Sequence, residues 1–114
     1  MSVKLSTRQV GDVSVVDVAG RITLGEGSSA LRDMLRDMVG KNQKKILLNL
    51  GDVSYIDSSG IGELVSGFTT VTNQGGQLKL LKLTKRVKDL LQITKLYTVF
   101  DVHDDEAAAV RSFA

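Results

Sequence analysis

Hydrophobic and polar positions alternate at the start of the chain, as expected for a strand with one buried face. Residues 3–7 carry valine, leucine or threonine at every second position, and residues 13–18 form a second run rich in valine. Gly11 and Asp12 stand between the two runs and have the composition of a tight turn. The pattern predicts an N-terminal β-hairpin, whose second strand Gly20 is expected to end.

The middle of the chain changes to helical spacing and back. Apolar residues recur every three or four positions in residues 31–39 and again in residues 61–71, which predicts two amphipathic helices. Ser28 or Ser29 is expected to cap the first of them. Between the helices, residues 46–50 form a short apolar run of the kind that suits a central strand covered on both faces.

The last third of the chain continues this alternation. We expect a strand over residues 78–83, a helix opened by Thr84, a strand over residues 97–102 and a short terminal helix capped by an aspartate at 104 or 105. This order predicts an α/β fold, with a mixed sheet of about four to five strands begun by the hairpin and flanked by about four helices. No linker or repeat interrupts the pattern, so residues 1–114 are predicted to form one domain.

Composition and charge exclude several classes of protein. The hydrophobic fraction of 42% is sufficient for a core, and a formal net charge of +2 is too small to indicate direct nucleic-acid contact. Cysteine is absent and His103 is the one histidine, so thiolate and multi-histidine metal sites are excluded within a single chain. Without a signal peptide or a membrane span, the sequence predicts a cytoplasmic protein with no cofactor.

Two motifs are compared with enzyme signatures and favour no enzyme. Residues 25–30 match the G-x-G-x-x-A pattern of dinucleotide sites, with Asp52 beyond it, but the preceding segment looks too short and polar for a central strand. Ser58 and Ser59 lack the G-x-S-x-G context of a hydrolase nucleophile. His103 lies in an acidic stretch and is expected at the surface, so the residues do not indicate a catalytic triad.

Basic residues gather in one segment of the chain. No aromatic side chain interleaves with them, which favours a solvated face over a nucleic-acid site, although the cluster could attract an acidic protein partner. The cluster consists of Lys79, Lys82, Lys85, Arg86 and Lys88.

The stretch DVSYIDSSGIGELV, residues 52–65, places a carboxylate and two hydroxyls just before a helical pattern. Asp57 or Ser58 can cap that helix, because side chains of both types accept hydrogen bonds from free backbone amides, and Gly60 allows close packing. One cap needs only one of these polar groups. From the residues alone, a generous cap and a chemically used serine both remain open.

The order of residues in this stretch resembles the signature of the STAS domain, and in particular that of bacterial anti-sigma factor antagonists. In that family a hydrophobic strand and a short acidic turn, here Asp52, precede D-S-[ST]-G-[LI]-G and an amphipathic helix. Residues 57–62 fill every position of the motif. The resemblance continues through GGQLKLLKLTKRVKDLLQITKLYTVFDV, residues 75–102, and implies that nearly the whole chain has the STAS fold.

The resemblance implies a switch in transcription regulation. Antagonists of this family bind a serine kinase that is also an anti-sigma factor, and this sequestration releases the sigma factor. The kinase phosphorylates the first serine of the motif, which is Ser58 here, and a serine phosphatase restores the active form. A second interpretation is a STAS subunit or scaffold of a transporter ATPase or signalling complex, which is never phosphorylated.

The same motif assigns neighbouring residues to partner binding. Asp57 is expected to hydrogen-bond near the acceptor hydroxyl, whereas Ser59 is expected to act mainly as a cap and as a second possible acceptor. Gly60 and Gly62 are expected to let a partner approach the helix closely.

The loop after the second strand departs from the family pattern. Many antagonists carry G-x-[LIV]-D there, whereas residues 20–23 of this chain read GRIT. Thr23 therefore replaces a carboxylate, and Arg21 adds a positive charge. Since this loop lies beside the phosphoacceptor in the family, the change implies a partner other than the sporulation or general-stress kinases.

Overall fold

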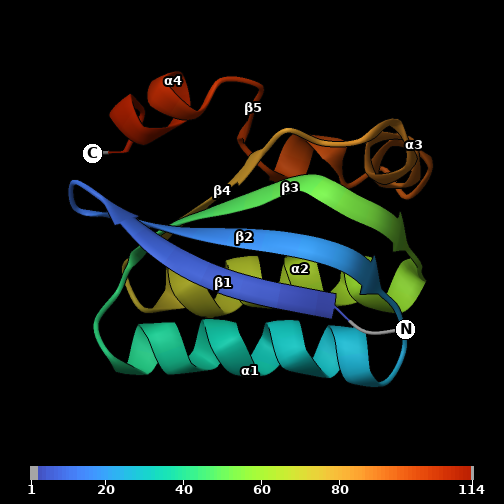
Figure 1. Cartoon of the computed structure of the whole chain (residues 1–114), viewed down its shortest axis with the longest axis horizontal. Coiled ribbons are helices and arrows are strands. Elements are labelled where there is room, and N and C mark those ends of the chain that lie inside the picture. Colours follow the sequence, from blue (N-terminus) through green and yellow to red (C-terminus); the bar gives the residue numbers. More distant parts are fainter. Residues whose placement is uncertain (1–2, 114) are drawn as a thin grey trace.

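The computed structural model describes residues 3–113 and contains one five-stranded mixed sheet with helices on both faces (Figure 1). The strands lie in the order β1-β2-β3-β4-β5; β1 and β2 are antiparallel and the other neighbours are parallel. The predicted fold class is confirmed, while Met1, Ser2 and Ala114 of the predicted domain lie outside the described residues. The elements are β1 (Val3–Val10), β2 (Val13–Ile22), α1 (Glu26–Gly40), β3 (Lys45–Ile56), α2 (Ser58–Asn73), β4 (Gln77–Leu81), α3 (Lys85–Ile93), the 3₁₀ turn η1 (Tyr97–Val99), β5 (Val102–His103) and α4 (Glu106–Arg111).

Strand β2 is longer than the sequence predicted. The hairpin turns at Gly11 as expected, but Gly20 does not end β2, which continues beside β3 to the buried Ile22. Two register irregularities interrupt the pairing, between Asp17 and Ala19 and between Gly20 and Arg21. Gly20 has a positive φ of 96° at this irregular position, so a glycine that resembles a stop in the sequence instead supports a bulge within the strand.

Helix α1 starts earlier than predicted and without a side-chain cap. Gly25, with φ 97°, is the N-cap, and Ser28 is buried in the first turn, where its amide donates to the Thr23 carbonyl at 3.0 Å. A Cβ on Gly27 would lie 2.6 Å from the Arg21 carbonyl oxygen, so the helix start packs directly on β2. Close packing against the backbone of β2 thus explains why residue 27 is a glycine. The segment before the G-x-G-x-x-A pattern is the full-length strand β2, whereas we had expected it to be too short and polar for a central strand.

Strand β3 is also longer than the apolar run that predicted it. It begins at Lys45 and continues to Ile56, immediately before Asp57. Asp52, which resembled a turn residue, pairs with Ala19 inside the sheet. The second half of β3, residues 51–56, contains exposed residues that obscured the strand pattern in the sequence. It connects the sheet to α2 without an intervening loop.

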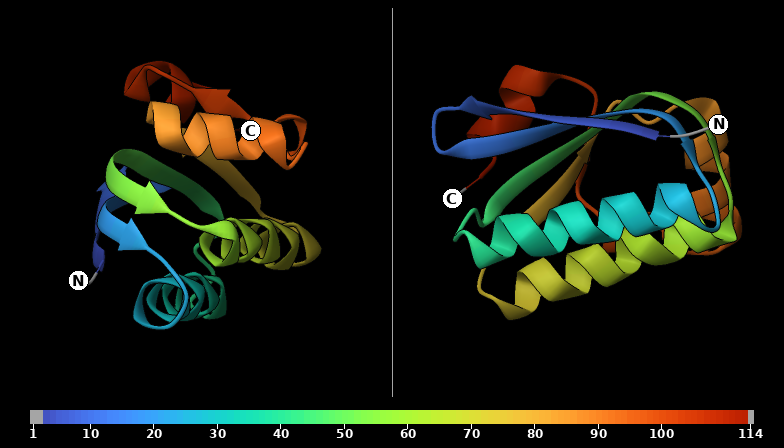
Figure 2. Two further views of the ribbon diagram at one scale, coloured as in Figure 1. Left: turned by 90° about the vertical axis from the view of Figure 1, so that its right-hand side faces the viewer. Right: turned by 60° about the horizontal axis from the view of Figure 1, so that its bottom comes forward.

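Helices α1 and α2 lie on one side of the sheet, and α3 and α4 lie on the other (Figure 2). Two apolar clusters hold them in position. The larger cluster fills the space between the sheet and the pair α1 and α2, and it extends to Val87 and Leu91 of α3. Leu35 and Leu64 are fully buried in it, as their helical spacing predicted. The smaller cluster lies under α4 and consists of Val13, Val15, Leu47, Leu81 and Ala109.

The predicted strand over residues 97–102 is wrong. Only Val102–His103 pairs as β5, because Lys95 has a φ of 63° and the Leu96 amide donates to the Leu91 carbonyl at 2.8 Å, which folds the chain back onto α3. His103 is not fully at the surface as expected. Its ring is 21% exposed, and Nε2 lies 3.1 Å from Asp101 Oδ2.

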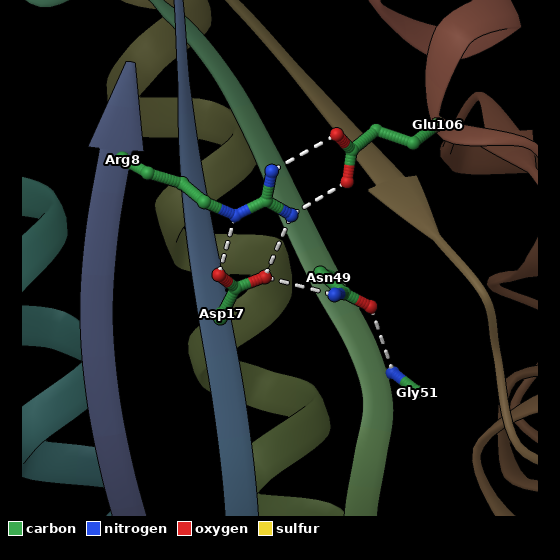
Figure 3. A network of polar contacts seen from close by, with 5 residues as sticks. All are labelled: Arg8, Asp17, Asn49, Gly51 and Glu106. Atoms are coloured by element: carbon green, nitrogen blue, oxygen red, sulfur yellow. Dashed lines mark hydrogen bonds and ion pairs between the residues drawn. The ribbon is translucent and has the colours of Figure 1, made fainter. Parts of the chain in front are cut away.

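A polar network joins α4 to the hairpin and the sheet (Figure 3). The Arg8 guanidinium donates to Asp17 at 2.7 and 3.1 Å and to Glu106 of α4, with 2.9 Å to Oε2. Asn49 of β3 donates to the same Asp17 carboxylate at 2.8 Å. These hydrogen bonds raise the pKa of Arg8, first through Glu106, and lower the pKa values of Asp17 and Glu106, first through Arg8.

Candidate functional site

The carboxyl ends of β2 and β3 and the first turns of α1 and α2 meet at one edge of the molecule (Figures 1 and 2). The Asp57 amide donates to the Ile22 carbonyl at 3.3 Å, which joins the start of α2 to the end of β2. Open α/β sheets expose binding sites at this kind of edge, because parallel strands all end there and helices begin there with free amides. Every residue that the motif singled out lies along it.

Ser58 is the first residue of α2, and its side chain is exposed. No hydrogen bond to its hydroxyl is present among residues 3–113. The oxygen is thus open to solvent at the positive end of a helix of 16 residues. The hydroxyl is accessible from outside the folded chain without any local unfolding.

Asp57 is the N-cap of α2 and is fully engaged in holding the fold. Its Oδ1 accepts from the Gly60 amide and the Ser59 hydroxyl, each at 3.0 Å, and its Oδ2 accepts from the Leu24 amide at 3.1 Å. Ser59 is therefore not the cap that we expected: it donates to the capping side chain. The expected hydrogen bonding of Asp57 near the acceptor involves Ser59 and the β2–α1 loop rather than Ser58.

The pKa of Asp57 is lowered by these contacts. Partial burial is the largest single influence and acts to raise it, but the combined hydrogen bonds from Gly60, Leu24 and Ser59 outweigh burial. The carboxylate is thus charged at neutral pH and adds a negative charge beside Ser58, at the helix end where anions are favoured.

The two glycines of the motif have different surroundings. Gly60 is buried, and a Cβ there would clash with the Ile22 carbonyl oxygen and lie 2.6 Å from Ile56 Cγ1. A glycine is therefore required at position 60 because the ends of β2 and β3 pack against it. We had expected it to allow the approach of a partner, and the structure corrects this expectation. Gly62 is exposed, and a Cβ there would have no atom within 4 Å, so the surface around it is open.

The loop between β2 and α1 contributes a residue that we missed. Leu24 is 81% exposed, although its amide is fixed by Asp57. The hydrogen bond to Asp57 places this exposed leucine at the same edge of the molecule as the start of α2. The hydrophobic pattern gave no sign of it, because one leucine among glycines and polar residues resembles an ordinary loop. Thr23 is half-buried beside it.

Arg21 and Arg86 contact the same aromatic ring. Their guanidinium carbons lie 4.7 and 4.5 Å from the centroid of Tyr55, which pairs with Arg21 in the β2–β3 register. The basic residues predicted to form one solvated cluster thus have separate partners, and Arg86 lies over Tyr55. Lys79 is 12% exposed and pairs with Asp101 at 3.0 Å, and Lys85 pairs with Asp89 at 2.7 Å.

The family of the chain follows from comparison with known proteins. The model of the STAS domain family matches residues 4–109. The anti-sigma-B factor antagonist of Bacillus subtilis (strain 168) is 33% identical over 102 residues, which cover 90% of this chain and 92% of that protein. The chain belongs to the STAS domain family, and this relative is an anti-sigma factor antagonist.

Solved structures share the fold at low sequence identity. An anti-sigma factor antagonist from Mycobacterium paratuberculosis gives a TM-score of 0.86 at 17% identity, covering 97% of this chain and 93% of its own. The Bacillus cell fate determinant SpoIIAA in its phosphorylated form gives 0.74 at 17%, covering 95% and 97%. The murine anion transporter Slc26a9 gives 0.77 at 18%, with 91% of this chain matched to 18% of that protein.

Two further properties concern the part of the chain from Val3 to Phe113. None of its helices is long and apolar enough to cross a membrane. No three of its histidine or acidic side chains are grouped so that they could hold a metal ion. The site described above therefore consists of an exposed hydroxyl, a capping carboxylate, an exposed leucine and two arginines stacked on a tyrosine.

Proposed function

We propose that this protein is an anti-sigma factor antagonist whose binding is switched off by phosphorylation of Ser58. The observation that carries the proposal is that the residues at the start of α2 differ in their contacts. Asp57, Ser59 and Gly60 are occupied with holding the helix on the sheet, while the Ser58 hydroxyl is exposed and free of hydrogen bonds to residues 3–113. A cap alone does not need that hydroxyl.

The energetics favour a switch that spares the fold. A phosphate would add about −1.5 to −2 charges at neutral pH. The helix end offsets this by about 0.3–1 kcal/mol, whereas two unit charges about 4 Å apart repel by about 4 kcal/mol at an effective dielectric constant of 20 and by about 1 kcal/mol in water. Since Ser58 is exposed, water hydrates the phosphate in the free protein, and the domain remains folded.

The same phosphate acts strongly inside an interface. A docked partner removes water from Ser58, so the dianion either loses its hydration or must find a cation. A change from 99% to 1% binding-competent protein requires a preference of about 5.5 kcal/mol. The free-energy cost of an uncompensated charge in a dry interface is of that order, whereas the cost of burying a serine hydroxyl is much smaller.

The proposed partners follow from the same role. A serine kinase that is also an anti-sigma factor binds the edge formed by Leu24, Ser58 and Gly62. A serine phosphatase removes the phosphate and restores the form that can bind. The chain itself, one domain over residues 1–114, performs no catalysis and acts in the cytoplasm. The phosphorylated form of SpoIIAA among the structures with this fold supports the switch.

Phosphorylation of single-site variants tests the proposal. The kinase that binds the parent protein is incubated with ATP and each variant, and intact mass is measured. We expect one phosphate on the parent and on Ser59→Ala, and none on Ser58→Ala. Equal phosphorylation of Ser58→Ala and the parent would show that the site is elsewhere.

A second candidate function is a permanent subunit or scaffold of a transporter or signalling complex. The observation in its favour is that this fold also matches a part of the anion transporter Slc26a9. Protein purified under mild conditions from its own cells distinguishes the two. Retention of a transporter ATPase, with no kinase and no phosphate on Ser58, would favour the second function.

A further inference from the structure

The two arginines on Tyr55 form a feature that phosphorylation of Ser58 does not use. We call Arg21, Tyr55 and Arg86 the arginine–tyrosine cluster. Arg21 lies near the end of β2 and Arg86 in the first turn of α3, and both stack on the ring that β3 places between these elements. The sheet and α3 therefore bring two positive charges together from distant parts of the sequence.

Neither arginine is neutralised by the residues from Val3 to Phe113. Some basic residues of this chain have carboxylate partners, such as Arg8 with Asp17 and Lys79 with Asp101. Arg21 and Arg86 are exposed and form no ion pair within that part of the chain. Stacking on a ring occupies the face of a guanidinium and leaves its N–H edge free to donate.

The cluster lies at the same edge of the molecule as Ser58. Arg21 precedes Ile22, whose carbonyl accepts from the Asp57 amide, and Tyr55 stands two positions before Asp57. A protein that covers Ser58 at this edge therefore approaches two unpaired guanidinium groups. The free N–H edges need an acceptor there, because an unpaired charge at an interface loses hydration without compensation.

We propose that the arginine–tyrosine cluster binds aspartate or glutamate side chains of the protein that docks over Ser58. The planar fork of an arginine matches a carboxylate with two parallel hydrogen bonds, and two neighbouring arginines match an acidic segment. The inference rests on the proposed function for the identity of the docking protein. The cluster then selects among partners by charge. An acidic partner surface is attracted to the two arginines during the encounter, whereas a basic surface is repelled.

A titration with an acidic peptide tests the cluster without the natural partner. Hexaglutamate is added to ¹⁵N-labelled protein at low salt, and the Nε–Hε signals of Arg21 and Arg86 and the ring signals of Tyr55 are followed. We expect saturable shifts at these groups. The double variant Arg21→Gln/Arg86→Gln should bind at least about tenfold more weakly, since both charged forks are lost.

Matched variants make the result decisive. Arg36→Gln removes one exposed arginine from α1, on the other face of the sheet, and should leave hexaglutamate affinity unchanged. Arg21→Lys/Arg86→Lys keeps the charges without the fork and should bind with intermediate affinity, which preserves the test if the glutamine variant fails to fold. Equal affinity of the parent and the folded glutamine variant, or an equal loss with Arg36→Gln, would overturn the proposal.

Two further arms separate related explanations. Inorganic phosphate that shifts the same signals at lower concentration than hexaglutamate would overturn the assignment to carboxylates. Ser58→Ala should retain hexaglutamate binding in full, because the cluster does not include the hydroxyl. If the kinase adds no phosphate to Ser58 of the parent protein, the switch is disproved and the acidic site still stands. If the parent protein does not bind hexaglutamate, the acidic site alone is disproved.

Discussion

At the scale of single residues, the start of α2 separates side chains that hold the helix in place from an exposed hydroxyl that does not. Asp57 accepts three hydrogen bonds, from Ser59, Gly60 and Leu24, while Ser58 beside it accepts none from the described residues. The sequence predicted this group of residues but not their division. Propensity alone allows Asp57 or Ser58 to be the cap, and only the path of the chain from β3 decides that Asp57 points back to the loop.

The charge of Asp57 should contribute to stability in a pH-dependent way. Asp57→Asn keeps an N-cap of similar size but loses the negative charge, so the free energy of unfolding should fall by about 1 kcal/mol at neutral pH. Because the pKa of Asp57 is lowered in the folded state from its ordinary 3.8, the stabilisation is fully present above that value. It is lost as the pH falls through the lowered pKa.

Urea unfolding between pH 7 and pH 2 measures this difference. The curves of the parent and Asp57→Asn should converge at the acid end of the range. Asp33→Asn, at an exposed position of α1, controls for the loss of one negative charge. A constant difference at all pH values would mean that the charge of Asp57 is not the cause.

At the scale of elements, the helices and their buried faces were predictable, but the ends of the strands were not. Periodicity located α1 and α2 because their apolar faces repeat over several turns. Gly20 and Asp52 resembled stops, yet both lie within strands whose pairing with neighbours outweighs local preference. For the site this matters at Arg21, which lies in β2 beyond the end that was predicted at Gly20.

Gly60 and Gly62, near the start of α2, should respond oppositely to the same substitution. Gly60→Ala forces a Cβ against Ile22 and Ile56 and should destabilise the protein by about 1–3 kcal/mol. Gly62→Ala meets nothing within 4 Å and should stabilise the helix by up to about 1 kcal/mol. Thermal unfolding of both variants is the measurement. Equal effects of the two substitutions would show that the start of α2 does not pack on β2 as described.

At the scale of the whole molecule, α4 depends on contacts that are far apart in sequence. It covers the smaller apolar cluster and is joined to the hairpin through Arg8 and Glu106 (Figure 3). The sequence predicted a short terminal helix but not its partner, because long-range ion pairs leave no local pattern. The positions of Arg21 and Arg86 on one ring were unpredictable for the same reason.

Removal of the Arg8 charge should loosen α4. Arg8→Met retains much of the apolar stem and should reduce the free energy of unfolding by about 1 kcal/mol, because the network is partly exposed. Arg8 lowers the pKa values of Asp17 and Glu106 from 3.8 and 4.5, so the loss of stability should be full above these ordinary values and should vanish as the pH falls through the lowered pKa values.

Hydrogen exchange of the α4 amides locates the effect. The amides of residues 109–112 should exchange faster in Arg8→Met than in the parent, with little change in α2. Lys41→Met, which removes a more exposed pair with Asp37 in α1, should change stability by no more than about 0.5 kcal/mol. Uniformly faster exchange throughout the sheet would instead indicate a global loss of stability.

The central claim is that a phosphate on Ser58 prevents docking and leaves the domain folded. Its most direct test compares the affinity of the anti-sigma factor for the parent and for protein with phosphoserine incorporated at position 58. Phosphoserine at the exposed Ser66, two turns further along α2, is the control for a dianion on the same helix. We predict an affinity loss of about 10⁴-fold for position 58, with an unchanged unfolding temperature and a much smaller loss for position 66. Equal affinity of the parent and the protein phosphorylated at position 58 would contradict the account.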